Sequence, residues 1–345
     1  MDRLITYIRY SCLGLIIFLS ACIRDGQDPC PPVDPSEYYS YIRFVYDYNM
    51  AFEDLFHRQV SNIDLYLFDE DGIYIGRLTD EAEQGMTFPK GYILGLPEMY
   101  KEACQFVAFP GVNSEHALIS SLTPYSSTID ELELKLHGNG SNSSTSNTIS
   151  NALETSLSPL WHGCIAQIPT RVGRNDTTII SLTKNTNKLR IALQSMDESV
   201  KFDINEFSFC LEAANNRYDA YNNTTGSDFW QYLPFLKENN EGETVGVAEL
   251  HTMRLMAGQQ NRLTIRHLPT ATTVLTINLN TYLEALKMQE YTRMELQEYM
   301  DREDQYKLLV FLTPSPVDPT GTEMKWLATQ ISINDWVCRD QINEF

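Results

Sequence analysis

The stretch IDLYLFDEDGIYIGRL, residues 63–78, decides the fold class that we predict for this chain. Residues 63–68 and 73–78 are rich in β-branched and aromatic side chains, and an acidic turn that ends in Gly72 separates them. A strand, a turn that contains glycine and a second strand are the pattern of a β-hairpin. The stretch therefore predicts an antiparallel hairpin.

The same turn also resembles half of a calcium loop, because carboxylates alternate before the glycine. A calcium loop needs a bidentate glutamate six positions beyond that glycine, where this chain has Leu78. The plain hairpin is therefore the favoured interpretation, and no metal site is predicted.

Similar strand patterns occur on both sides of this hairpin. They lie at residues 41–48, 104–109, 129–136, 160–166, 176–183, 187–193, 207–211, 247–256, 262–268, 274–279, 306–312 and 331–339. Residues 138–147 read as an exposed loop, and residues 215–240 read as a long polar and aromatic connection. Many short strands with turn signals between them predict an all-β protein made of two tandem β-sandwiches.

One short helix is predicted among these strands, in the second sandwich. Thr292 followed by Glu295 forms a capping box, and apolar residues follow it up to Met300. The connector Lys184-Asn185-Thr186 joins two strand patterns, and strand content restarts after it. We therefore predict an N-terminal sandwich over residues 37–183 and a C-terminal sandwich over residues 184–345.

The N-terminus carries a lipoprotein processing signal. Arg3 and Arg9 precede a short apolar run, and Leu19-Ser20-Ala21-Cys22 follows at its end. We interpret residues 1–21 as a signal peptide and Cys22 as the lipid attachment site; an ordinary secretory signal with an incidental cysteine is the alternative. Residues 22–36 are rich in proline and predict an extended tether.

The charge of the chain excludes one class of partner. The formal net charge is −20, and removal of residues 1–21, which hold Asp2, Arg3 and Arg9, takes away a net +1 and leaves −21. Such a surface is repelled by phosphate backbones, so nucleic acid is not an expected partner. Anionic lipid headgroups repel it too, so the lipid is the expected membrane contact.

The remaining cysteines and the histidines form no recognisable site. The cysteines are odd in number and lack metal-binding spacing; they are Cys30, Cys104, Cys164, Cys210 and Cys338. Buried thiols are the favoured interpretation, and bridges between Cys104 and Cys164 and between Cys210 and Cys338 are the alternative. The histidines are scattered as well: His57, His116, His137, His162, His251 and His267. His162 and Cys164 share a strand face, but no third group orients them for nucleophilic catalysis. We expect no enzyme, catalytic residue, metal or cofactor.

Several segments occur in an order that resembles a known family. They are the lipobox, residues 63–72, residues 160–163, residues 182–188, residues 298–304 and the closing residues 333–336. This order resembles the fimbrial anchor family of Bacteroidia, the FimB-type minor subunits, over essentially the whole chain. The resemblance implies two transthyretin-like β-sandwiches at the base of a fimbrium, held in the outer membrane at the cell surface by lipid on Cys22. It also implies that the protein binds the fimbrial shaft subunits and limits the length of the shaft.

Two further hypotheses concern binding. A sandwich has open sheet edges, so an incoming strand of a shaft subunit would add main-chain hydrogen bonds. The alternative function is a surface lipoprotein that binds glycan or a host ligand, with Tyr221, Trp230 and Tyr232 stacking on sugar rings.

Overall fold

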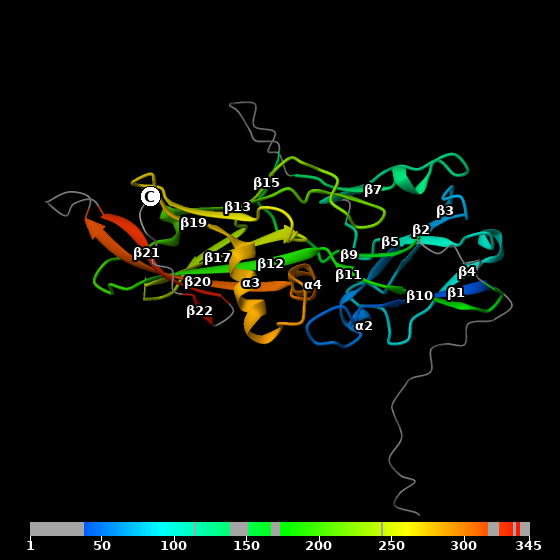
Figure 1. The fold of residues 1–345 in the computed structure, drawn as a ribbon, viewed down its shortest axis with the longest axis horizontal. Helices are drawn as coiled ribbons and strands as arrows, with labels where there is room; N and C mark the ends of the chain where they lie inside the picture. Colours follow the sequence, from blue (N-terminus) through cyan, green and yellow to red (C-terminus); the bar gives the residue numbers. More distant parts are fainter. Residues whose placement is uncertain are drawn as a thin grey trace, which may run out of the picture. The chain divides into compact units, whose positions relative to one another are not determined.

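A computed structural model describes residues 38–113, 115–138, 151–166, 173–242, 244–316, 324–333 and 336–338, all within one compact unit. β-strands are the predominant regular structure of these residues (Figure 1). Within them, no helix has the length and apolar character needed to cross a membrane. The predicted signal peptide, the tether and Cys22 lie outside the described residues.

The first sandwich packs a sheet of order β10-β1-β4 against a sheet of order β11-β9-β5-β2-β3. Its strands are β1 (Tyr38–Val45), β2 (Asn62–Phe68), β3 (Tyr74–Glu81), β4 (Leu94–Pro97), β5 (Gln105–Ala108), β9 (Trp161–Ile165), β10 (Thr177–Ser181) and β11 (Thr183–Lys184). Apolar side chains from both sheets form one buried cluster, which includes Phe44, Leu65, Leu67, Phe106 and Ile180.

The predicted hairpin is confirmed as β2 and β3. The two strands pair antiparallel, with Leu65 opposite Leu78. The Asp69 carboxylate accepts backbone N–H bonds from Asp71 at 3.0 Å and from Ile73 at 2.9 Å, and Gly72 takes a positive φ of 75°. These are the features of a local turn.

The second sandwich packs a sheet of order β16-β17-β12-β20-β21-β22 against a sheet of order β19-β18-β13-β15-β8 (Figure 1). Its strands are β8 (Ala152–Leu153), β12 (Thr186–Ser195), β13 (Phe207–Ala213), β15 (Trp230–Tyr232), β16 (Leu236–Asn239), β17 (Val245–Met253), β18 (Arg262–His267), β19 (Thr272–Asn278), β20 (Gln305–Pro316), β21 (Met324–Ile333) and β22 (Trp336–Cys338). The predicted fold class, all-β with tandem sandwiches, is confirmed.

A third sheet, of order β14-β7-β6, links the two halves of the chain. Its strands are β6 (Ala117–Ile119), β7 (Glu133–Leu136) and β14 (Arg217–Asp219). Leu132, Leu134 and Leu136 share a buried cluster with Phe68 and Val107 of the first sandwich. Strand β14 pairs with β7, and β8 joins a sheet of the second sandwich, so pairings run across the predicted boundary at residues 183 and 184 in both directions. That boundary stays a prediction.

The described residues of the second half contain two helices, where the sequence predicts one. They are α3 (Leu279–Glu290) and α4 (Leu296–Arg302), and a short α2 (Phe56–Gln59) lies in the first half. Helix α3 was missed, although Asn278 caps it and Leu279, Tyr282, Leu283 and Leu286 bury one face at helical spacing. The predicted capping box is wrong, because α4 starts after Glu295 and no side chain caps it.

Three other predicted segments are corrected. Residues 129–136 begin with the 3₁₀ turn η2 (Ile129–Glu131), and only their second part is a strand. Residues 215–240, predicted as a long connection, contain the three short strands β14, β15 and β16. Two further 3₁₀ turns lie elsewhere in the chain, η1 (Glu98–Tyr100) and η3 (Ile204–Glu206). The closing strand is in fact two, because Ile333 of β21 pairs with Trp336 of β22. The predicted loop at residues 138–147 lies largely outside the described residues.

The close approach of the two sheets in the first sandwich predicts a specific steric conflict. A Cβ at Gly163 of β9 would lie 2.5 Å from Cγ2 of Ile180 and 3.0 Å from the backbone oxygen of Ser181. We therefore expect Gly163→Ala to lower the free energy of unfolding by about 1–3 kcal/mol, the usual cost of overpacking. Urea unfolding of the purified variant measures this. At the control position Gly258 nothing lies within 4 Å, so Gly258→Ala should leave stability nearly unchanged; equal effects of both variants would contradict the prediction.

Candidate functional site

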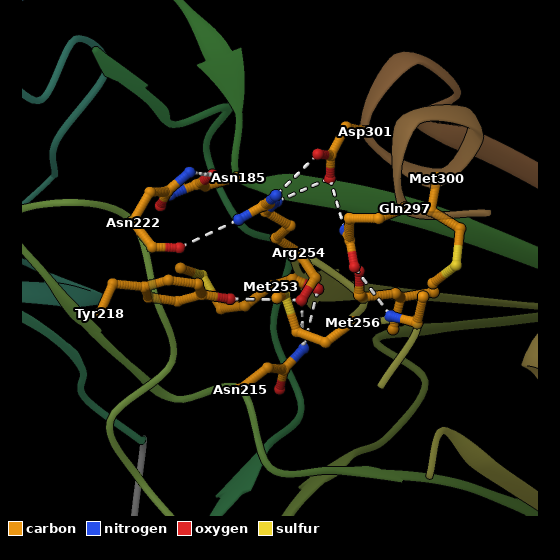
Figure 2. A network of polar contacts seen from close by, with 12 residues as sticks. Asn185, Asn215, Tyr218, Asn222, Met253, Arg254, Met256, Gln297, Met300 and Asp301 are labelled. Carbon is orange, nitrogen blue, oxygen red and sulfur yellow. Dashed lines mark hydrogen bonds and ion pairs between the residues drawn. The ribbon is translucent and has the colours of Figure 1, made fainter. Parts of the chain in front are cut away.

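The connector between the two sandwiches is built into both of them. The Asn185 amide N–H donates to the Leu160 oxygen at 2.7 Å, and the Asn185 oxygen accepts from the Arg254 amide at 2.8 Å. Asn185 and Asn222 exchange side-chain amide hydrogen bonds of 2.6 and 3.0 Å, and the Asn185 residue is fully buried (Figure 2). A connector bonded in this way does not act as a free hinge.

A buried ion pair lies beside this connector. The Arg254 guanidinium donates from Nε and Nη2 to the two carboxylate oxygens of Asp301, each at 2.6 Å, and from Nη1 to the Asn222 oxygen at 3.0 Å (Figure 2). The side chains of Arg254 and Asp301 are 12% and 6% exposed. Bidentate, charge-assisted bonds of this kind hold both partners in one geometry. The pair joins the end of β17 to helix α4.

Further hydrogen bonds hold the backbone of Arg254 and of its neighbour Leu255. The Arg254 oxygen accepts from Asn215 Nδ2 at 2.9 Å and from the Tyr218 hydroxyl at 3.3 Å. Gln297 of α4 donates to Asp301 at 2.7 Å and to the Leu255 oxygen at 3.1 Å (Figure 2). Buried polar groups are costly unless they are bonded, so this set specifies one arrangement of the loop after β17.

The solvent side of the same junction is a charged cleft of about 470 Å³. Lys184 forms an ion pair with Asp304, and its ammonium lies 5.5 Å from the centre of the Trp161 ring. The Arg302 guanidinium lies 4.2 Å from the Tyr48 ring centre, in cation–π geometry. The cleft is lined by Tyr46, Asn49, Met50, Ala51, Leu55, Gln59, Pro159, Lys184, Arg302, Glu303, Asp304 and Gln305. Burial raises the pKa of the Glu303 carboxyl.

Three of the segments that carry the family resemblance meet at this junction. Residues 182–188 contact residues 298–304 through Lys184 and Asp304, and the Lys188 amide donates to the Asp304 oxygen at 2.8 Å. Residues 160–163 join them through the bond between Leu160 and Asn185. The sequence singled out these segments without showing that they lie together.

His162 and Cys164 serve the structure and do not form a nucleophile pair. His162 Nε2 lies 2.9 Å from the Ala220 oxygen, so the ring ties β9 to the second half of the chain. Burial lowers the pKa of His162 to about 4 and raises that of the Cys164 thiol to about 12. A neutral imidazole that already bonds a carbonyl, beside a protonated thiol, is not an activated nucleophile.

The other cysteines and histidines give no metal centre or disulfide in the part of the chain that the structure describes. Cys104, Cys164 and Cys210 are thiols outside any disulfide. This contradicts both alternative bridges, the one between Cys104 and Cys164 and the one between Cys210 and Cys338. Cys104 is buried, whereas Cys164 and Cys210 are half-buried. No group of three or more His, Cys, Asp or Glu side chains converges there as metal ligands do. Cys22 and Cys30 lie outside the described residues.

The proposed sugar-stacking aromatics are mostly in the core. Trp230 is 4% exposed and Tyr232 is fully buried, because β15 pairs with β13 inside the second sandwich. The Tyr232 hydroxyl donates to Asn215 at 2.6 Å and so belongs to the junction network. Only Tyr221 of the three, at 40% exposed, lies at the surface. The predicted aromatic platform is therefore wrong.

Comparison with known proteins identifies relatives over nearly the whole chain. The family model described as fimbrillin-A associated anchor proteins Mfa1 and Mfa2 matches residues 28–342. No curated protein sequence matches.

Several solved structures resemble the fold. A proposed polysaccharide-binding protein from Bacteroides thetaiotaomicron is 29% identical, with a TM-score of 0.70, over 89% of this chain and 99% of that one. A proposed adhesin from the same organism is 25% identical, with a TM-score of 0.68, over 90% and 99%. The fimbrial anchor protein Mfa2 from Porphyromonas gingivalis is 17% identical, with a TM-score of 0.61, over 87% and 98%, and shares the fold.

The buried ion pair predicts a large stability difference between two arginines. Arg254→Leu leaves Asp301 buried without its cation, so we expect the free energy of unfolding to fall by about 3–5 kcal/mol. The matched control is Arg262→Leu, because Arg262 also donates through Nε and Nη2 to a carboxylate, that of Glu212, but is 53% exposed. That control should cost about 1 kcal/mol or less. Urea unfolding of both variants measures the difference, and equal losses would contradict a dominant role of the buried pair.

The depressed pKa of His162 predicts a loss of stability in acid. Between its unfolded pKa of about 6.5 and its folded pKa of about 4, the unfolded chain binds a proton that the folded chain does not, so stability falls as pH falls. From pH 7 to pH 4.5 this histidine should account for about 2–3 kcal/mol. Urea unfolding at both pH values measures this change. His162→Asn should reduce it, whereas His137→Asn, at an exposed position, should not. Equal pH dependence in all three proteins would contradict the assignment.

Proposed function

We propose that this chain, which belongs to the family of fimbrillin-A associated anchor proteins Mfa1 and Mfa2, attaches a fimbrial shaft to the outer membrane through lipid on Cys22 and limits the length of that shaft. The observation that carries the proposal is the family match over residues 28–342, which includes both sandwiches and the junction between them. The family consists of fimbrial anchor proteins and is not an enzyme family, which supports a structural role for this chain.

The predicted lipid supplies the membrane contact in this proposal. One acyl chain binds a membrane only marginally, so the two or three chains of a bacterial lipoprotein would be needed for durable attachment. The net charge of −21 after removal of the signal peptide supports attachment by lipid, because an acidic surface gains nothing from anionic headgroups. The protein would then lie at the cell surface, at the base of the fimbrium.

The junction suits a part that transmits force from the membrane to a filament. Asn185, Arg254 and Asp301 are bonded across it, and the connector itself is bonded at residues on both sides. A fixed junction would pass tension from one sandwich to the next without a slack linker. For the contact with the shaft we propose strand addition, since the sheet orders place strands such as β10, β3 and β16 at sheet edges.

A second candidate function is binding of glycan or a host ligand. The observation that favours it is the 29% identity to the Bacteroides thetaiotaomicron protein described as a proposed polysaccharide-binding protein. Trp230 and Tyr232 are buried, so they do not form the aromatic platform for sugar rings that this function was expected to use. Anchoring therefore remains the leading proposal.

The anchor proposal predicts that Cys22 determines in which cell fraction the protein and the shaft subunits are found. In Cys22→Ala cells the protein should shift from the membrane fraction to the soluble fraction, and shaft subunits should appear in the medium with it. Fractionation followed by immunoblotting for both proteins measures this. The matched control is Cys30→Ala, eight residues further along the predicted tether, which should leave both at the membrane.

Two outcomes would count against the proposal in different ways. Membrane retention of the Cys22→Ala protein would show that lipid is not the anchor. Release of the protein without any change in the shaft would show that the shaft is held by another subunit.

A further inference from the structure

The first strand of the first sandwich pairs with a strand close to the end of that sandwich. Strand β1 starts at Tyr38, directly after the predicted tether, and β10 ends at Ser181, shortly before the connector to the second sandwich. The two strands are parallel over five registered pairs, from Tyr41 opposite Thr177 to Val45 opposite Ser181. The strand that enters the sandwich is therefore a neighbour, in one sheet, of β10, which is followed only by the two-residue β11, paired with β9 in the other sheet.

The hydrogen bonds at the two ends of this pair fix the pattern between them. The Tyr41 amide donates to the Asp176 oxygen at 2.9 Å, and the Leu182 amide donates to the Val45 oxygen at 2.8 Å. In a parallel ladder the amides of one strand point alternately toward and away from its partner. The amides of Thr178 and Ile180 therefore face β1, and those of Thr177 and Ile179 face the open edge, because β10 is an edge strand.

Parallel strands loaded at opposite ends resist force in a particular way. Tension at the amino end of β1 and at the carboxyl end of β10 pulls the two strands in opposite directions along their own axes. The ladder hydrogen bonds run between the strands, so the five registered pairs bear the load together. If both strands were pulled from the same end, the bonds would open one after another and each would bear the load alone.

We infer that β1 and β10 form a shear clamp, which keeps the first sandwich folded when a filament pulls on the anchor. This inference rests on the proposed function, because lipid on Cys22 makes the amino end of β1 the point where force enters. Forced unfolding is governed by the unfolding rate. A subunit that bears load therefore needs a high barrier to unfolding at the strands where the force enters and leaves it.

The packing beneath the ladder supports the clamp. Ile42 and Phe44 of β1 and Ile180 of β10 are at most 1% exposed, and all three belong to the core of the first sandwich. Sliding one strand past the other would move these side chains out of register with that core. The hydrogen bonds and the packing therefore oppose the same movement.

The second sandwich repeats the arrangement at its own entrance. Its first long strand, β12, follows the connector and pairs in parallel with β20 over eight residues, from Lys188 opposite Gln305 to Ser195 opposite Leu312. Force that reaches the amino end of β12 and leaves toward the C-terminal strands would again load a parallel pair in shear. The connector delivers that force directly, since Asn185 is bonded to both Leu160 and Arg254.

Single-molecule force spectroscopy on the full mature chain tests the clamp by changing only the direction of pull. One handle is attached to the N-terminal tether, and the other to a reactive residue that replaces either Ser181 or Arg174. Ser181 is the carboxyl end of β10, and Arg174 lies just before its amino end. Both positions are exposed. The handle at position 181 loads the pair in shear, and we expect a rupture force several-fold higher than with the handle at position 174. Equal forces in the two geometries would overturn the inference.

Two proline variants test the ladder itself in the shear geometry. Thr178→Pro removes an amide that faces β1 and should lower the rupture force, whereas Ile179→Pro removes an amide that faces the open edge and should leave it nearly unchanged. Equal reductions would contradict the assigned ladder. Should Thr178→Pro fail to fold, the comparison of pulling directions still decides the question.

These measurements use purified protein without membrane or shaft, so they separate the clamp from the anchor. A weak clamp together with loss of membrane retention in Cys22→Ala cells would remove this inference and leave the anchor function. A strong clamp together with unchanged membrane retention would refute lipid anchoring by Cys22 and leave the mechanical property of the fold.

Discussion

The ion pair between Arg254 and Asp301 is the constraint on which the rest of the structure depends. Two buried charges are stable only when they pair in good geometry and their remaining donors and acceptors are hydrogen-bonded. Here the Asn222 oxygen accepts from Arg254, and the Gln297 amide donates to Asp301. Movement of β17, of α4 or of the loop at Asn222 would leave a charge buried without its partner. The junction between the sandwiches therefore has one favoured arrangement, and the sheets on either side are fixed to it.

The exchange of strands between the two halves strengthens that arrangement. Strand β8 precedes the connector but completes a sheet of the second sandwich, and β14 follows the connector but pairs with β7. His162 reaches across as well, to the Ala220 oxygen. Separation of the two sandwiches would therefore break backbone ladders and a buried hydrogen bond, and not merely a surface contact. Such a junction can carry tension because no part of it is a free linker.

The sequence predicted what local patterns determine. Alternation and turn chemistry between residues 63 and 78 were sufficient for the hairpin, because a strand of period two and a glycine with positive φ leave signals within a few residues. Helix α3 has a comparable signal in Asn278 and Leu279 to Leu286, but it follows β19 without a break, and the predicted strand at residues 274–279 includes its first residue while no element is predicted for the rest. The site had no local signal, since Arg254 and Asp301 are 47 residues apart and only tertiary pairing brings them together. Trp230 and Tyr232 were misread for the same reason.

The pairing of β1 with β10 has a consequence for folding as well as for force. Tyr41 and Thr177 are far apart in the chain, so the entropy of closing a long loop opposes formation of this ladder and makes it slow. Until then β1 presents an unpaired edge, which is open to strands of other molecules. The same long-range pairing places β1 and β10 side by side. If β1 and β10 were antiparallel, tension at the amino end of β1 and at the carboxyl end of β10 would act at the same end of the ladder and open its hydrogen bonds one at a time.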